Sequence, residues 1–206
     1  FDERVLLKNV SVTIQRGDKC AIIGPNGIGK STLLKILLKE VHSDQGNFEW
    51  SDTVNVGYFA QDYRTLLNPE QTILQWMEDN IAAPSQEIRK VLGQVLFRGA
   101  DVDKKIGVLS GGESARLIMA KLILEKHNVL IFDEPTNHLD LESIDALIEA
   151  IQLFPGTVLF VSHNRYFIDD IATRIIVLTE QYGVQDFLGN YNDYLEQYGK
   201  DYLATA

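Results

Sequence analysis

The sequence has very little cysteine and no long hydrophobic run. Cys20 is the only cysteine among 206 residues, so no disulfide can form within the chain, which fits a reducing compartment. Cys20 sits in an apolar run, where we expect it to pack as a small hydrophobic side chain. The apolar runs at 129–132 and 158–161 are far too short to span a bilayer, and no signal peptide is recognisable. We therefore expect a soluble, cytoplasmic protein without membrane insertion.

Positive charge is also scarce. The chain carries 19 Lys and Arg against 29 Asp and Glu, a formal net charge of −10. Such a balance gives no broad attraction for nucleic acid or anionic membrane, so we expect no direct DNA binding, although a local RNA-binding patch stays possible. The hydrophobic fraction of 45% is ordinary for a globular protein. With this length, it predicts one domain with a large core.

Apolar runs alternate with helical patterns over much of the chain, and there is no internal repeat. This alternation predicts an α/β fold, with helices on the faces of a mostly parallel sheet. Between them, the middle helices predict a small helical subdomain. Four tyrosines at helical spacing near the end predict a packing stripe. The expected strands are 10–14, 19–23, 46–50 paired with 54–60, 129–133, 157–162 and 175–179; the expected helices are 30–39, 72–80, 86–97 with Ser85 as N-cap, 112–125, 143–153 and 165–171; the tyrosines are Tyr191, Tyr194, Tyr198 and Tyr202.

A glycine-rich segment follows the apolar run 19–23. Residues 24–31, Gly-Pro-Asn-Gly-Ile-Gly-Lys-Ser, match the phosphate-loop pattern G-x-x-x-x-G-K-[ST], with a strand expected before it and a helix after it. Glycines let successive backbone N–H groups point at phosphate oxygens, the helix N-terminus adds its dipole, and Lys30 supplies a mobile cation. Ser31 can place its hydroxyl on Mg²⁺, whereas Thr32 faces a phosphate or caps the helix. An ordinary glycine-rich turn is the alternative. The predicted nucleotide-binding residues here are Gly24, Pro25, Asn26, Gly27, Ile28, Gly29, Lys30, Ser31 and Thr32.

Two carboxylates follow the apolar run 129–132. Ligands of open α/β sheets bind at the carboxyl ends of the strands, so Asp133 should emerge beside residues 24–31 and hold Mg²⁺, mainly through coordinated water. Glu134 then suits orientation and deprotonation of the water that attacks the γ-phosphate. The alternative is a solvated strand end. The next apolar strand ends near His163, which can hydrogen-bond the γ-phosphate; alone, a histidine at a strand end is more often structural.

Together these motifs identify the chain as similar to ATP-binding-cassette (ABC) ATPases over essentially its whole length. Residues 24–32, Gln61, 109–113 (Leu-Ser-Gly-Gly-Glu), 133–135, 137–140 and His163 occur in the order seen in that superfamily. Within it, Asp-Glu-Pro-Thr-Asn-His-Leu-Asp at 133–140, Ser-His-Asn-Arg-Tyr-Phe at 162–167 and Gly-Asn-Tyr-Asn-Asp-Tyr at 189–194 resemble the ABC-F branch. Members of that branch carry two cassettes on one soluble chain and act on ribosomes.

The resemblance implies roles that the residues alone do not give. It implies an ABC cassette with a mostly parallel core sheet, an antiparallel β subdomain and a helical subdomain; ATP and Mg²⁺ as cofactors; and ATP hydrolysis that regulates translation. Gln61 becomes a sensor of the γ-phosphate and of Mg²⁺. Ser110, Gly111 and Gly112 would touch ATP bound on a second cassette, which lies in the same full-length chain or in a homodimer; Asp140 would shape that interface. Without the family, residues 110–112 would read as a helix start. Phe1 falls at the position that stacks on adenine.

Two residues depart from the family pattern. Asn164 stands where most members have Asp, which puts the fine positioning of His163 in doubt. Ser114 stands where ABC-F proteins usually have a basic residue. The resemblance also implies that residues 1–206 are a single nucleotide-binding domain, with a core at 1–61 and 127–206 and a helical subdomain at about 62–126. We expect it to be a fragment of a two-cassette protein, more specifically its C-terminal cassette.

Two other functions compete with this interpretation. The chain could be the ATP-binding subunit of a membrane transporter; Asn137-His138, where transporters usually have Ser-Ala, and Glu113 in place of Gln argue against it. It could also be a regulatory cassette that binds nucleotide without hydrolysing it. The presence of both Glu134 and His163 argues against that function.

Overall fold

The core of the protein is a six-stranded sheet in the order β2-β3-β4-β1-β5-β6. The computed structural model describes residues 5–60, 62–137, 139–179 and 183–204. All neighbouring strands are parallel except β5 and β6, which pair antiparallel with Ile176 opposite Asp186. The described strands are β1 (Lys19–Ile23), β2 (Val56–Phe59), β3 (Val129–Asp133), β4 (Thr157–Val161), β5 (Arg174–Thr179) and β6 (Gly183–Leu188). The predicted mostly parallel α/β fold is confirmed.

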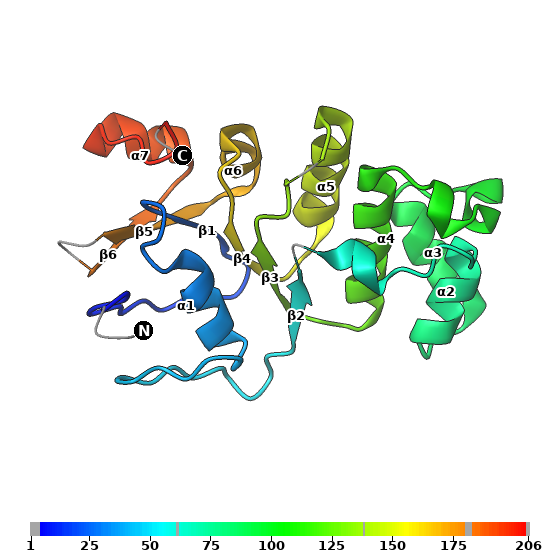
Figure 1. Ribbon diagram of the computed structural model, residues 1–206, viewed down its shortest axis with the longest axis horizontal. Coiled ribbons are helices and arrows are strands. Elements are labelled where there is room, and N and C mark those ends of the chain that lie inside the picture. Colours follow the sequence, from blue (N-terminus) through cyan, green and yellow to red (C-terminus); the bar gives the residue numbers. More distant parts are fainter. Residues whose placement is uncertain (1–4, 61, 138, 180–182, 205–206) are drawn as a thin grey trace.

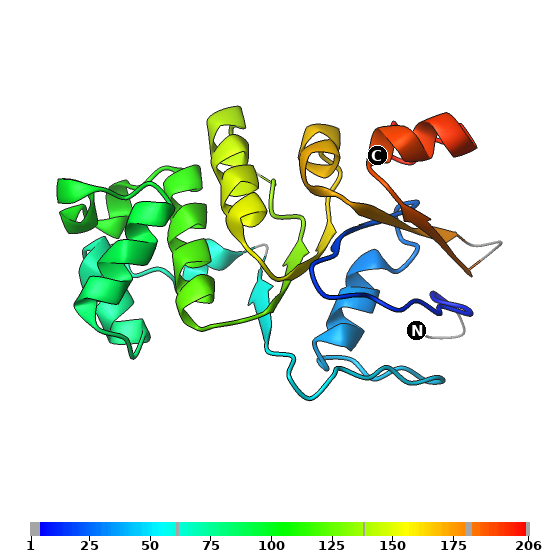
Figure 2. The ribbon, with the colours of Figure 1, turned by 180° about the vertical axis from the view of Figure 1, so that it is seen from behind.

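Helices cover both faces of this sheet. α1 lies on one face, whereas α5, α6 and α7 lie on the other; α2, α3 and α4 gather at the end beyond β2 (Figures 1 and 2). The α-helices are α1 (Lys30–Leu37), α2 (Ile73–Asn80), α3 (Ser85–Gln94), α4 (Gly111–Leu124), α5 (Leu141–Leu153), α6 (Arg165–Ile171) and α7 (Tyr191–Tyr198), and the short 3-10 helices are η1 (Tyr63–Leu66), η2 (Gly99–Asp103) and η3 (Ile106–Val108). None of these described helices is long and apolar enough to cross a bilayer.

Alternate side chains of the central strands build two separate cores. Cys20 and Ile22 point to the α1 side, where they pack with Leu34, while Ala21 and Ile23 point to the other side. This follows from the period of two in a strand, which sends successive side chains to opposite faces. Cys20 is fully buried, as predicted. The tyrosine stripe is largely confirmed, because Tyr191, Tyr194 and Tyr202 are buried while Tyr198 stays 46% exposed.

Several predicted local elements are wrong. Residues 10–14 and 46–50 form no strand, and β2 pairs in parallel with β3 instead of with 46–50. In the first segment Val12 and Ile14 pack against the α1-side core while their neighbours are exposed, so the alternation reflects burial of one side without a hydrogen-bonded ladder.

Asn55 and Asn128 fix the start of the β2–β3 pair: the Asn128 N–H donates to Asn55 O at 2.9 Å, and Asn55 N–H donates to Asn128 Oδ1 at 2.8 Å. Ser85 is the first residue of α3, and Pro84 occupies the N-cap.

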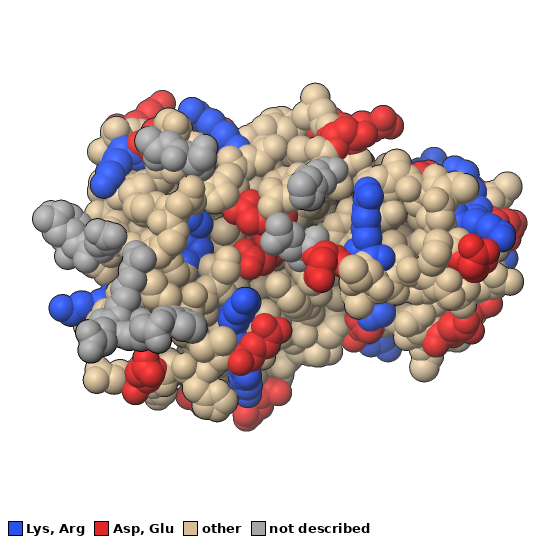
Figure 3. All heavy atoms as spheres, in the orientation of Figure 1, with Lys and Arg blue, Asp and Glu red and all other residues tan. Residues whose placement is uncertain are grey.

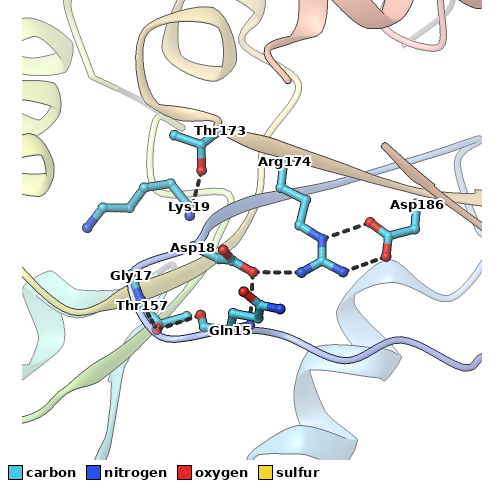
Figure 4. Close-up of polar contacts among 8 residues, drawn as sticks. All are labelled: Gln15, Gly17, Asp18, Lys19, Thr157, Thr173, Arg174 and Asp186. Atoms are coloured by element: carbon cyan, nitrogen blue, oxygen red, sulfur yellow. Dashed lines mark hydrogen bonds and ion pairs between the residues drawn. The ribbon is translucent and has the colours of Figure 1, made fainter. Parts of the chain in front are cut away.

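A buried arginine joins the amino ends of β1 and β5 to β6 (Figure 4). Arg174 is 8% exposed and forms a two-pronged ion pair with Asp186, with Nε 2.7 Å from Oδ1, while its Nη1 lies 2.6 Å from Asp18 Oδ2. Lys19, at the same edge, donates from Nζ to Phe154 O at 2.7 Å and Gly156 O at 2.9 Å. The polar groups at this end of the sheet are therefore matched to partners. We call it the amino edge.

Candidate active site

The opposite end of the sheet, the carboxyl edge, carries the phosphate loop, residues 24–31. The loop joins the last residue of β1 to α1, and Gly24 and Gly29 adopt φ values of 146° and 109° that side-chain-bearing residues rarely adopt. A Cβ on Gly24 would also lie 2.4 Å from Leu178 O, so only glycine fits there. Gly29 occupies the N-cap of α1 without a side-chain cap, which leaves the first N–H groups of the helix available to an anion.

Lys30 lies inside this loop. Its side chain bends back so that Nζ donates to Gly24 O at 2.9 Å and Pro25 O at 3.1 Å, and the residue is 8% exposed. Burial lowers the pKa of the Lys30 ammonium, while the carboxylates of Glu134 and Asp133 partly offset this change. A cation drawn toward the loop carbonyls, with two carboxylates nearby, is held ready for a polyanionic ligand.

Ser31 and Asp133 meet across the two strand ends. Ser31 Oγ donates to Asp133 Oδ1 at 3.0 Å, and Ser31 is exposed. No group of three or more His, Cys, Asp or Glu that could hold a metal occurs among the described residues. This pair nevertheless fits Mg²⁺, because Mg²⁺ commonly takes only one or two protein oxygens and completes its shell with water and phosphate.

Glu134 and His163 form the second half of the carboxyl edge. The N–H of Glu134 donates to Val161 O at 2.9 Å, which ties the end of β3 to the end of β4. Glu134 Oε2 accepts from the backbone N–H of His163 at 3.2 Å, and Glu134 Oε1 lies 3.2 Å from His163 Nε2. Burial raises the pKa of the Glu134 carboxyl, while the His163 charge and N–H oppose the rise. A carboxylate with a raised pKa is better matched to accept a proton near neutral pH.

This part of the site is incompletely satisfied and strained. Within the described part of the chain, the buried atoms Glu134 Oε1 and His163 Nδ1 have no hydrogen-bond partner of acceptable geometry. Glu134 also has a φ of 49°, a left-handed conformation that costs a side-chain-bearing residue roughly 1–2 kcal/mol. Strain and unmatched polar atoms of this kind concentrate at functional sites, where they indicate groups prepared for a ligand.

Sequence reasoning missed the residues that support Glu134 and His163. The hydroxyls of Thr136 and Ser162 are buried and lie 3.1 Å apart, and Ser162 Oγ accepts from the Asn164 N–H at 3.1 Å. The only sequence signal was that both flank predicted site residues. Asn164 caps α6, accepting from the Phe167 N–H at 2.9 Å, so the departure from Asp leaves the cap in place.

The segment 110–112 starts α4 rather than joining the phosphate loop. Ser110 Oγ accepts from the Glu113 N–H at 3.1 Å, and Glu113 Oε2 accepts from the Ser110 N–H at 2.9 Å, a capping box that fixes the helix start. A Cβ on Gly112 would lie 2.5 Å from Ser143 Oγ, so α4 packs on α5 without room for a side chain. Ser114 is buried, and Asp140 caps α5 by accepting from the Ser143 N–H at 2.9 Å.

The structure thus brings five of the predicted site residues into one cluster: Lys30, Ser31, Asp133, Glu134 and His163. Thr32 lies next to them, partly exposed, on α1. Gln61 and Phe1 lie outside the described residues. The segment 110–112 is not part of this cluster. Its contacts in the described part of the chain are with η1, α5 and Leu139.

Comparisons with known proteins agree with this geometry. The sequence profile of the ABC transporter family matches residues 7–137. The chain is 44% identical over 97% of its length to "Probable ATP-binding protein YbiT" of Escherichia coli O157:H7, and 40% identical over 96% of its length to ABC transporter F family member 5 of Arabidopsis thaliana. It spans only 38% and 29% of those proteins. A solved ABC transporter, described as of the metal-chelate type and inward-facing, matches with a TM-score of 0.69 at 25% identity, covering 88% of this chain and 75% of that one.

The chain therefore belongs to the ABC transporter family and is an ATP-binding cassette, a P-loop ATPase. Its homologues are ABC-F-type ATP-binding proteins, which confirms the resemblance drawn from the motifs. Cassettes of this family bind ATP with Mg²⁺ and work with a second cassette.

Proposed function

We propose that this cassette hydrolyses ATP when a second cassette closes on it, and that closure regulates translation on the ribosome. The observation that carries the hydrolytic part is the geometry of Glu134. This carboxylate is largely but not fully buried, held in a left-handed conformation and placed against His163 just beyond the end of β4. Its raised pKa suits the general base that takes a proton from the attacking water.

The other residues of the carboxyl edge position the nucleotide. The backbone N–H groups of residues 26–29 and the start of α1 would surround the phosphates, with Lys30 and Thr32 contacting them. Ser31 and Asp133 would hold Mg²⁺, with Gln61 as a further ligand and sensor; the ion neutralises phosphate charge when bound. His163 orients Glu134 and donates toward the γ-phosphate. Phe1 is proposed to stack on adenine.

The pocket is proposed to be half of a composite site. Segment 110–112 of one cassette would contact ATP bound to the other, with Asp140 shaping the interface. Residues 1–206 would then form a single domain, with a core at 1–61 and 127–206 and a helical subdomain at about 62–126. The chain covers only 38% and 29% of its relatives, which supports the proposal that it is one cassette of a longer, cytoplasmic two-cassette protein. We propose the C-terminal cassette because the run 61–76 is too compact for the arm that the family resemblance implies in a first cassette.

The ribosomal part of the proposal is supported by the type of homologue. Relatives at about 40% identity are ABC-F-type proteins, the branch that the sequence motifs at 133–140 and 162–167 resemble. A transporter subunit is the second candidate, because the matched solved structure is described as an ABC transporter. A second cassette in the full-length chain favours the first function, whereas a partner protein with membrane-spanning helices favours the second.

Glu134→Gln in the full-length protein tests the hydrolytic part. Removing the general base should lower ATP turnover by about 10²- to 10⁴-fold while ATP affinity is retained, and the protein should accumulate in a closed two-cassette state. Glu149→Gln on the exposed side of α5 is the matched control and should leave turnover unchanged. Unchanged hydrolysis by Glu134→Gln would remove the assignment of the base.

Ribosome binding is tested with the same trapped protein. The full-length Glu134→Gln variant should co-sediment with ribosomes in the presence of ATP and be released without nucleotide. Lack of ATP-dependent co-sedimentation, with turnover lost as expected, would refute the ribosomal role while leaving the ATPase assignment intact.

A further inference from the structure

η1, which follows β2, contacts α4, and two of its side chains reach the first turn of that helix. Tyr63 on η1 is 4% exposed, and its hydroxyl donates to Gly111 O at 3.1 Å. Burial raises the pKa of the Tyr63 hydroxyl, and the nearby Arg64 partly opposes this rise, so the group stays a protonated donor. Tyr63 therefore fixes η1 relative to the segment 110–112, and with it the start of the Arg64 side chain.

Arg64 reaches over the same glycine. A Cβ on Gly111 would lie 2.6 Å from Arg64 Nη2 and 3.1 Å from Leu139 Cδ2, so the guanidinium occupies the space directly above the backbone of Gly111. Arg64 is exposed, and none of the carboxylates in the described ranges forms an ion pair with it. The guanidinium therefore lies exposed beside the segment proposed to face the second cassette, with the Tyr63 hydroxyl as a hydrogen-bond partner.

We infer that Arg64 is an additional ATP-contacting residue, which binds the phosphates of the nucleotide on the second cassette beside Ser110. This inference rests on the proposed two-cassette site. A guanidinium offers several N–H donors in a planar fork, the geometry that matches phosphate oxygens, and Tyr63 pre-positions it. The glycine at position 111 then serves the site by leaving space for this side chain. Arg64 acts on the second cassette's nucleotide, whereas Lys30 acts on that of its own pocket.

The test measures nucleotide binding at each pocket separately in the full-length protein. The protein carries Glu134→Gln and the equivalent substitution in the second cassette, is photolabelled with 8-azido-ATP, and is cleaved between the cassettes before labelling is quantified. Arg64→Ala should raise the half-labelling concentration of the second cassette about 10- to 100-fold, as expected for loss of a charge-assisted hydrogen bond to phosphate, and leave that of its own cassette unchanged. Arg64→Lys should restore part of the affinity, because it keeps the charge without the fork.

Controls separate the possible failures. Arg89→Ala, on the exposed side of α3, should change neither pocket. Ser110→Arg should weaken labelling of the second cassette whatever the role of Arg64. If Ser110→Arg does so and Arg64→Ala does not, the inference about Arg64 is wrong and the composite site stands. If Ser110→Arg has no effect on the second cassette, the composite site and the inference both fall. Equal weakening of both pockets by Arg64→Ala, or a lowered melting temperature, would make Arg64 a structural residue and overturn the inference.

Discussion

The two edges of the sheet differ in whether their charged and polar side chains have partners within the protein. At the amino edge, Arg174 is enclosed by Asp18 and Asp186 (Figure 4). The ammonium of Lys19 donates to two carbonyl oxygens at the same edge. At the carboxyl edge, in the described part of the chain, the buried His163 Nδ1 has no hydrogen-bond partner, and Glu134 Oε1 faces His163 Nε2 at 3.2 Å without a well-aligned hydrogen bond. Both edges belong to the same sheet, and β1 contributes to both of them. The satisfied edge stabilises the fold, and the unsatisfied edge is prepared for a nucleotide.

The surface around these edges gives little further selectivity. On the face shown in Figure 3, acidic and basic side chains are interspersed over most of the molecule. With a net charge of −10, the protein as a whole repels polyanions. We therefore expect ATP binding to depend on local groups such as Lys30 and the N–H groups of the phosphate loop. Substitutions at the two edges should then separate effects on binding from effects on stability.

The largest expected effect is that of Lys30→Ala on the carboxyl edge. Its Nζ is the cation within the phosphate loop, so its loss should weaken ATP binding about 100-fold, as for a charge-assisted contact to phosphate, with little change in melting temperature. Isothermal titration calorimetry with ATP and Mg²⁺ measures this. Lys35→Ala, an exposed lysine in the same helix, is the matched control. Normal affinity in Lys30→Ala would contradict the phosphate-loop assignment.

Arg174→Met should produce the opposite result at the amino edge. The substitution leaves Asp18 and Asp186 without their cation, and we expect a loss of about 2 kcal/mol in the free energy of unfolding, less than for a fully buried pair because both carboxylates are partly exposed. Affinity for ATP should stay within twofold. Denaturant unfolding measures the first quantity, with Arg16→Met in the neighbouring turn as control.

The Arg174 contribution should also depend on pH. Its hydrogen bond lowers the pKa of the Asp186 carboxyl below the ordinary value of 3.8, so the unfolded state takes up a proton first as pH falls. The stabilisation is thus fully present above about pH 4 and is lost as pH falls through the lowered pKa. The stability difference between wild type and Arg174→Met should shrink in acid; a constant difference would show that the ion pair is not its source.

His163→Ala should shift the pH dependence of hydrolysis. The His163 charge lowers the pKa of Glu134, opposing the larger upward effect of burial. Without the imidazole, the pKa of Glu134 rises further, so the acidic limb of the kcat/KM profile should move to higher pH. His42→Ala, at an exposed position, should leave the profile unchanged. A shift of the limb toward lower pH would contradict the assignment of Glu134 as base.

Asn164→Asp should have the smallest effect. A carboxylate accepts the Phe167 N–H as well as an amide oxygen does, so the change in unfolding free energy should stay within about 0.5 kcal/mol, whereas Asn164→Ala should cost about 1 kcal/mol. Thermal unfolding compares the three proteins. A large gain in turnover by Asn164→Asp would show that the departure from the family pattern does affect His163.

The sequence predicted the buried parts of the fold best. The strands β1, β3 and β4 are apolar runs at the middle of a parallel sheet, and α6 begins at a capping residue, so pattern and structure agree there. β6 was missed because it is a half-exposed antiparallel edge strand without a clear alternation. Residues 10–14 were predicted as a strand because apolar and polar residues alternate along them, but alternation alone does not supply a partner for the backbone hydrogen bonds.

Site residues whose chemistry follows from their residue type could be predicted from the sequence. Features that depend on three-dimensional geometry could not. Lys30, Ser31, Asp133, Glu134 and His163 converge as expected from strand ends at one edge of a sheet. Arg64 and Gly111 lie 47 positions apart in the sequence, so no local sequence pattern predicts their contact. The left-handed conformation of Glu134 likewise has no signal in the sequence, and it occurs where the Glu134 N–H donates to Val161 O, 27 residues further along the chain.

The left-handed conformation of Glu134 places the proposed hydrolytic activity in conflict with the thermal stability of the fold. At φ 49° a glycine would cost the folded chain less than glutamate does, so Glu134→Gly is expected to give a protein that resists heat better and no longer turns over ATP. Selection for thermal resistance alone, without selection for ATP turnover, would therefore not retain this glutamate. Position 134 is for that reason a poor choice for consensus-based stabilisation, and a sensitive marker of whether a related cassette still works as a motor.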